Sequence, residues 1–156
     1  MSTARKLPTP VVKYSPLDNT FSASIDKSEP IDFQATFKKV NYPQEGEPAR
    51  WTIEARYRDS TTNHIQSIRI IFLKSPENNK PVRANEDLRI LYSNTAEVPP
   101  SEYSTSAATT AIDFDAAVGS VSGNISATVS DDLEAPKHHE LTIAFDLIAE
   151  HWVKRI

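Results

Sequence analysis

The chain of 156 residues contains no cysteine and only three glycines. Without cysteine, disulfide scaffolds, iron–sulfur clusters, thiol catalysis and cysteine-ligated zinc sites are excluded together. With so little glycine a glycine-rich phosphate-binding loop is hard to build, and no such motif is present. No apolar run approaches the roughly 20 residues that a membrane-spanning helix needs. We therefore expect a fold stabilised by a hydrophobic core, which a chain of about 150 residues can supply.

An excess of basic residues and a secretion signal are also missing. The formal net charge is −4, which argues against nucleic acid as a partner because phosphate binding needs a basic surface. The N-terminus leads into Pro8 and Pro10 rather than into an apolar run, unlike a signal peptide. We expect residues 1–10 to be a flexible segment and residues 11–156 to form one domain. We also expect a soluble, cytoplasmic protein with no membrane span, although the sequence leaves export by another route open.

Apolar and polar residues alternate with a period of two in several parts of the chain. The pattern is clearest between Gly119 and Ser130, where small or apolar residues take turns with uncharged polar ones. Successive strand side chains point to opposite faces, so this segment is predicted to be a half-buried strand. The same period recurs in residues 31–38, 51–58 and 141–149. It predicts an antiparallel all-β protein.

The turn-rich segment 41–48 predicts a hairpin between two of these strands. Folding the chain there places Phe37 opposite Ile53 and Ala35 opposite Ala55, with apolar side chains on a shared face.

A second hairpin is predicted around the loop 131–139. In the simplest register Ile125 lies opposite Phe145, and Gly123 lies opposite Leu147. A slip of one residue would turn one apolar set to the wrong face. The face of each residue is therefore a firmer prediction than its partner.

One segment departs from simple alternation. In residues 65–74 four apolar residues, Ile70 to Leu73, follow one another and would point to both faces of a strand. Such a strand is expected to be central and covered on both sides, or to enter a second layer at its end. This favours a single-domain antiparallel β-sandwich of about seven to nine strands. The alternative is a closed antiparallel β-barrel.

The histidine pair His138 and His139, followed by Glu140, is the weak candidate for a metal site. Adjacent residues of an extended strand point to opposite faces, so the two imidazoles could share an ion only if the chain bends. A solvated strand entrance is the favoured interpretation. No catalytic motif and no cofactor motif is present, so we expect no cofactor and favour a non-catalytic protein over an enzyme.

The candidate binding residues lie on two strand faces. Ser122, Asn124 and Ser126 belong to a face with hydroxyl and amide groups but no charge, which suits a polyhydroxylated ligand or another protein. Ile148 and Trp152 share a parity opposite to the apolar core set of their strand. They are expected to pack under a loop or to contact a partner.

These observations predict a non-catalytic binding or assembly module that contacts a protein or a glycan through loops or a strand face. The alternative is a β-barrel with a lipocalin-like role that holds a small apolar ligand. A hydrolase or metal enzyme is the third hypothesis.

Overall fold

A computed structural model describes six stretches of the chain, and every structural statement below concerns these stretches. They are residues 19–39, 51–74, 83–98, 102–115, 119–131 and 136–149. These residues form nine strands and no helix, and so no helix that could cross a membrane. The strands are β1 (Thr20–Ile25), β2 (Ile31–Asp32), β3 (Gln34–Lys39), β4 (Trp51–Arg58), β5 (Ile65–Phe72), β6 (Leu88–Asn94), β7 (Glu102–Asp115), β8 (Ser120–Ser130) and β9 (His138–Ile148).

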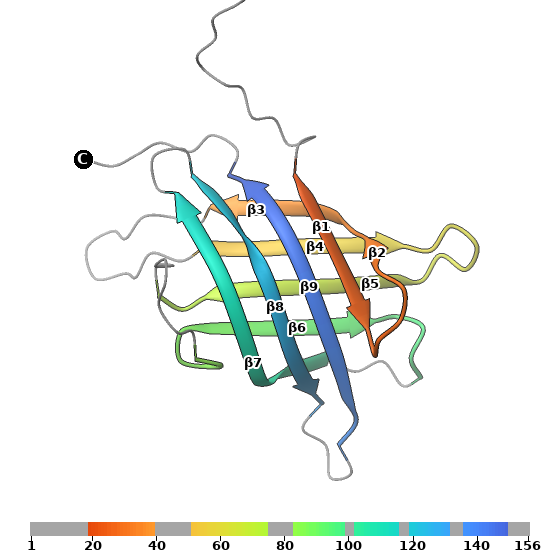
Figure 1. The fold of residues 1–156 in the computed structure, drawn as a ribbon. Helices are drawn as coiled ribbons and strands as arrows, with labels where there is room; N and C mark the ends of the chain where they lie inside the picture. The colour runs from red at the N-terminus through yellow and green to blue at the C-terminus, as the bar shows by residue number, and fades with distance from the viewer. Residues whose placement is uncertain are drawn as a thin grey trace, which may run out of the picture.

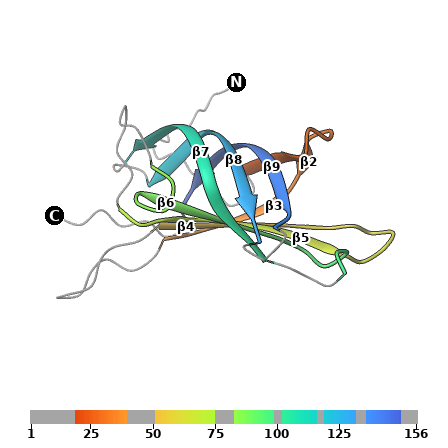
Figure 2. The same ribbon diagram turned by 90° about the horizontal axis from the view of Figure 1, so that it is seen from below.

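All nine strands belong to one antiparallel sheet with the order β2-β1-β9-β8-β7-β6-β5-β4-β3. From β3 to β9 each strand pairs with the next along the chain, and β1 then pairs with β9. In Figure 1, strands β7, β8, β9 and β1 form one layer that runs across a second layer of β3 to β6. Figure 2 shows β7, β8 and β9 arching over the flatter second layer.

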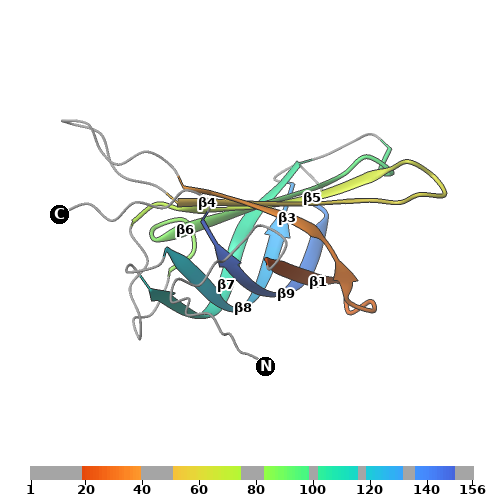
Figure 3. The same ribbon diagram turned by 90° about the horizontal axis from the view of Figure 1, so that it is seen from above.

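The sheet nearly closes on itself through the chain at Phe33. Its two edge strands, β2 and β3, are separated by this residue alone. The backbone N–H of Phe33 donates to the carbonyl of Phe21 in β1 at 2.8 Å. Figure 3 shows the chain passing from β1 into β3, from one layer to the other. The prediction of an antiparallel all-β protein is thus confirmed, and the strands take the barrel-like form, in which two packed layers belong to one nearly closed sheet.

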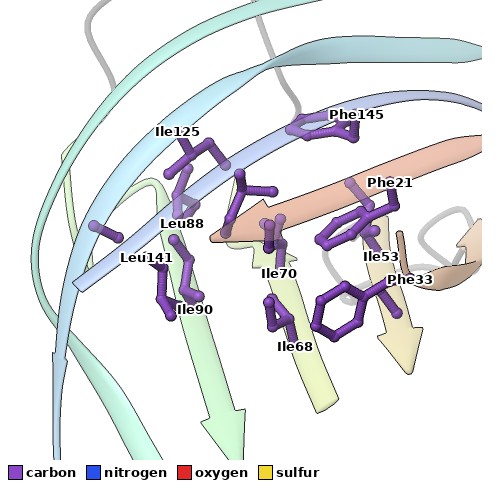
Figure 4. Packing of buried hydrophobic residues seen from close by; sticks show 14 of the residues in the cluster. Phe21, Phe33, Ile53, Ile68, Ile70, Leu88, Ile90, Ile125, Leu141 and Phe145 are labelled. Carbon is purple, nitrogen blue, oxygen red and sulfur yellow. The ribbon is translucent and has the colours of Figure 1, made fainter. Parts of the chain in front are cut away.

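The core lies between the two layers. Alternate residues of the strands point inward, and the side chains of Ile53, Ile70 and Ile143 are fully buried there. In Figure 4 the labelled side chains of both layers meet across this space. The ring centroid of Phe21 lies 5.8 Å from the ring centroid of Phe33 and 6.2 Å from that of Phe145. Apolar side chains therefore fill the described interior of the sheet.

The hairpin of β3 and β4 has the predicted register. Phe37 lies opposite Ile53 and Ala35 lies opposite Ala55. Phe37 and Ile53 are buried, which fits the shared apolar face that the alternation predicted.

The hairpin of β8 and β9 has the predicted faces but different partners. Ile125 lies opposite Ile143 and Gly123 lies opposite Phe145, a shift of two residues from the prediction. The shift arises because β9 begins at His138, opposite Ser130, so the pairing includes two residues that were assigned to the loop. A shift by an even number of residues leaves each side chain on its face.

Strand β5 is central, as expected, because it pairs with both β4 and β6. Its buried residues all point inward, whereas Ile71 is only half-buried on the outer face. There it lies between Thr52 and Arg89. The expected cover on both faces is therefore not found in the described residues, and Ile71 is an apolar residue of a largely polar outer face.

Candidate functional site

Two rows of short side chains, most of them polar, cross the outer face of the layer formed by β7, β8, β9 and β1. Each row takes one residue from each strand, because neighbours in the pairing register lie side by side on one face. The first row contains Asp113, Ser122, Asp146 and Thr20, and the second row contains Ala111, Asn124, Ala144 and Ser22.

These two rows line a groove with a volume of about 800 Å³. Its other lining residues are Thr110, Ile112, Gly123 and Phe145, which alternate with the outward-facing ones along the strands. Alanine, serine and glycine leave space above the backbone, so the middle of the layer is hollowed. We call this feature the polar groove.

Strand glycine Gly123 marks a close approach of β7 to β8. A Cβ atom at this position would lie 2.3 Å from the carbonyl oxygen of Ala111 and 3.0 Å from the Cα atom of Ile112. Both are backbone atoms, which cannot rotate away. Glycine is therefore required at this point of the groove floor because the neighbouring backbone occupies the space of a side chain.

The polar groove is acidic and contains no cationic side chain among its lining residues. The carboxyls of Asp113 and Asp146 lie on either side of Ser122 in the first row, two strands apart, or about 10 Å at ordinary strand spacing. Asn124 supplies an amide donor and acceptor, and Ser122 supplies a hydroxyl. The groove can thus offer hydrogen bonds of both kinds to a neutral or cationic ligand.

A smaller hollow of about 130 Å³ lies on the outer face of β4, β5 and β6. Its lining residues include Glu54 and Arg69, which form an ion pair with 3.3 Å between Oε2 and Nε. Within this hollow Glu54 and Arg69 are thus already paired with each other. It differs from the polar groove in size and in charge.

His139 is the centre of a polar cluster at one end of the barrel. Its Nδ1 atom lies 2.6 Å from Oδ2 of Asp26, and its Nε2 atom lies 2.9 Å from Oε2 of Glu97. The ring also packs edge-on against Tyr103, with 4.6 Å between the centroids. The hydroxyl of Tyr103 donates to the other carboxyl oxygen of Glu97. We call these four residues the histidine cluster.

Asp26 follows β1 in a left-handed backbone conformation, with φ of 56°. Its N–H donates to the carbonyl of Glu140, and its Oδ1 atom accepts a hydrogen bond from the Glu140 N–H at 2.9 Å. Partial burial of the Asp26 carboxyl raises its pKa. The interactions with the Glu140 N–H and the His139 ring lower it, and together they outweigh the effect of burial. The pKa of Asp26 therefore lies below its ordinary value.

The histidine pair does not form a joint site. His138 is exposed, whereas His139 points inward to the cluster, as the strand alternation predicts. The carboxyls of Asp26 and Glu97 lie at opposite nitrogens of one ring, so they do not converge on a common point. Within the described stretches, no group of three or more potential ligand residues could hold a metal ion.

The chain matches no family model, and no curated protein or solved structure is significantly similar to it. The function proposed below therefore rests on the polar groove itself.

The structure brings some of the predicted binding residues together and separates others. Ser122 and Asn124 line the polar groove. Ser126 is exposed on the same face but beyond the groove. Ile148 is half-buried at the end of β9, where its backbone N–H donates to the side chain of Asn19. Trp152 lies outside the described residues.

Sequence reasoning missed the contribution of β1 and the alignment of the two aspartates. Thr20 and Ser22 are polar residues of a short alternating strand, but nothing local indicates that this strand pairs with β9. Asp113 and Asp146 are brought into one row only by two strand registers, that of β7 with β8 and that of β8 with β9. The polar parity of β1 was the one local signal that this strand also contributes to the polar outer face.

Proposed function

We propose that the protein is a non-catalytic binding module whose polar groove takes a polyhydroxylated ligand, that is, a glycan. The observation that carries this proposal is the groove of about 800 Å³, lined by hydroxyl, amide and carboxyl groups from four strands. This volume falls within the range of about 300–1,000 Å³ that is common for ligand sites.

The chemistry of the lining supports a sugar over an apolar molecule. Sugar hydroxyls both donate and accept, so they can pair with the carboxyls of Asp113 and Asp146 and with the amide of Asn124. An apolar ligand would cover these groups and leave them without hydrogen bonds, which is unfavourable. Serine and threonine also lose little side-chain entropy when they are ordered by a ligand.

The second candidate, a small apolar ligand inside the barrel, has less support. The interior between the two layers is packed with apolar side chains, among them the fully buried Ile53, Ile70 and Ile143. Both hollows described above lie on outer faces of the sheet. An apolar ligand inside would have to displace packed side chains.

The test is a titration of the isotope-labelled protein with a panel of neutral and amino-substituted oligosaccharides, followed by NMR chemical shifts. We expect shifts at Ser122 and Asn124 for at least one member of the panel. Asn124→Ala removes the amide and should weaken that binding by about tenfold, which corresponds to one or two lost hydrogen bonds. The matched control is Ser67→Ala in the smaller hollow, which should bind with unchanged affinity.

Two results would contradict the proposal. One is the absence of groove shifts with every sugar of the panel. The other is an equal loss of affinity in Asn124→Ala and Ser67→Ala, which would place the ligand elsewhere. If a protein isolated from the native host produces the groove shifts instead, the groove is a protein-binding surface and the glycan proposal fails.

A further inference from the structure

The two edges of strand β7, Glu102–Asp115, are paired with neighbouring strands over unequal lengths. On one side it pairs with β8 from Ser104 to Asp115. On the other side it pairs with β6 only through three residues, from Glu102 to Ser104. The longest described strand is therefore held on both edges over a short part of its length.

The pairing with β6 ends at Ser104, just before a bulge in the β7–β8 pairing between Thr105 and Ala107. The hydroxyl of Thr105 accepts a hydrogen bond from the N–H of Ile90 and donates to the carbonyl of the same residue at 3.0 Å. The side-chain amide of Asn85 donates to the carbonyl of Thr105 at 2.8 Å. These side-chain contacts replace the backbone ladder at the point where β6 and β7 separate.

Beyond the bulge, residues 107–113 have no strand partner on the β6 side within the described part of the chain. In Figure 1 β7 is the outermost strand of the layer that it forms with β8, β9 and β1. Alternate residues of such an edge direct their N–H and C=O groups outward, where another strand can pair with them. We call residues 107–113 the open edge.

The open edge contains neither lysine nor proline, two residue types that protect many edge strands from pairing. Proteins commonly place lysine or proline on exposed edge strands. Strand β3, which ends the sheet, contains Lys38 and Lys39, whereas the whole of β7 contains no lysine, arginine or proline. Alanine and threonine predominate in the open edge, and such small side chains let a second backbone approach closely.

We propose that the open edge pairs antiparallel with the same edge of a second copy of this chain, about a two-fold axis near Thr110. A two-fold contact is self-complementary, because each residue that touches a partner residue is touched by its equivalent in return. Seven residues match the usual length of a strand, and the ladder between β5 and β6 also has seven residue pairs.

Charge favours the antiparallel arrangement. With the axis near Thr110, Asp113 of one copy lies opposite Ala107 of the other, because residues equally distant from the axis face each other. A parallel arrangement would set Asp113 against Asp113, and like charges directly opposite are destabilising. This inference is independent of the ligand proposed above, since it rests on the backbone of β7 and not on the groove.

The test uses sedimentation of the full chain over a wide concentration range together with single-cysteine variants. Because the chain has no cysteine, Thr109→Cys and Ala111→Cys each introduce one thiol beside the proposed axis. Both residues are exposed. We expect a dimer that dissociates on dilution, and a disulfide-linked dimer when the two variants are mixed, because residue 109 of one copy lies opposite residue 111 of the other. The matched control is Thr142→Cys in β9, which is also exposed but lies away from the edge and should not cross-link.

A double variant tests the electrostatic part of the proposal. Thr109→Lys with Ala111→Lys places four lysines around the axis and should weaken the dimer by about tenfold or more. Mixing it with Thr109→Asp and Ala111→Asp should restore the dimer as a mixed species. Circular dichroism checks that each variant keeps its β-structure.

Three outcomes would overturn the proposal. A monomer at every concentration excludes the second copy, and slow hydrogen exchange at residues 107–113 in that monomer would show that the chain itself covers the edge. A dimer that cross-links through Thr142→Cys but not at Thr109 or Ala111 has another interface. A dimer whose affinity is unchanged by the lysine variant also has another interface.

Discussion

His139 connects three parts of the chain that are far apart in the sequence. Its two nitrogens face Asp26, which follows β1, and Glu97, which lies between β6 and β7. A neutral imidazole has one N–H and can donate to only one of these carboxylates, whereas an imidazolium donates to both. The cluster thus joins β1 and β9 to the connection that crosses from one layer to the other.

Acid should weaken this cluster through Asp26. Because the pKa of the Asp26 carboxyl is lower in the folded protein than in the unfolded chain, its ionised form stabilises the fold above the unfolded pKa. This stability is lost as the pH falls through the folded pKa. We expect Asp26→Asn to be less stable than the wild type at pH 7, and the difference to shrink toward pH 2. Urea unfolding at a series of pH values measures both.

The control for this prediction is Asp113→Asn, which changes an exposed carboxyl of the polar groove. It should leave the free energy of unfolding within about 0.5 kcal/mol of the wild type. A constant difference between Asp26→Asn and the wild type from pH 7 to pH 2 would contradict the assigned role of the Asp26 charge.

Among the elements, β7 shows how one side chain determines where a ladder stops. Thr105 is buried, and its hydroxyl serves both the N–H and the carbonyl of Ile90. Without this hydroxyl the N–H and the carbonyl of Ile90 would lose these hydrogen bonds at the point where β6 and β7 separate. Buried polar groups without a hydrogen-bond partner are costly.

Thr105→Val should destabilise the protein by about 1–3 kcal/mol, because it keeps the shape of the side chain and removes the hydroxyl. Thr105→Ser retains the hydroxyl and should recover a large part of this loss. Urea unfolding gives the stabilities, and hydrogen exchange at the Ile90 amide should become faster only in the valine variant. Equal stability of the valine and serine variants would show that the hydroxyl is unimportant.

The elements also show what could be predicted from the sequence. Alternation identified the faces of β3, β4, β8 and β9, because a buried face needs an apolar residue at every second position. It could not give the β8 and β9 partners, since a shift of two residues preserves every face. The partners of His139 were beyond reach for a different reason: Asp26 and Glu97 lie 113 and 42 residues away along the chain, and no local pattern records such a contact.

At the scale of the whole molecule, Phe33 links the two layers. Its ring packs against the ring of Phe21 in β1, and the centroids of the Phe33 and Tyr57 rings lie 6.0 Å apart, which connects it to β4. The side chain is 3% exposed, and the residue stands where the chain crosses between the layers. Burial and position together make it the residue that holds the nearly closed sheet together at this side.

Phe33→Ala should lower the free energy of unfolding by about 3–5 kcal/mol, because it removes a buried ring and leaves a cavity. Phe33→Leu keeps more of the volume and should lose less. The control is Val98→Ala, since Val98 is 88% exposed and its truncation should change stability by no more than about 0.5 kcal/mol. Denaturant unfolding compares the three variants. A decrease in the free energy of unfolding of less than about 1 kcal/mol for Phe33→Ala would show that the packing of this ring contributes little to the stability of the fold.

The pairing of β1 with β9 bears on how the chain acquires its structure over time. Asn19 and Ile148 exchange two hydrogen bonds although 129 residues separate them. A ribosome releases β1 well before β9 exists, so β1 must wait for a neighbour while the strands from β3 onward can pair in order as they emerge. Bringing such distant segments together is entropically slow. The last of the described strands therefore pairs with the first of them, and we expect this closure of the barrel to be a late step of folding.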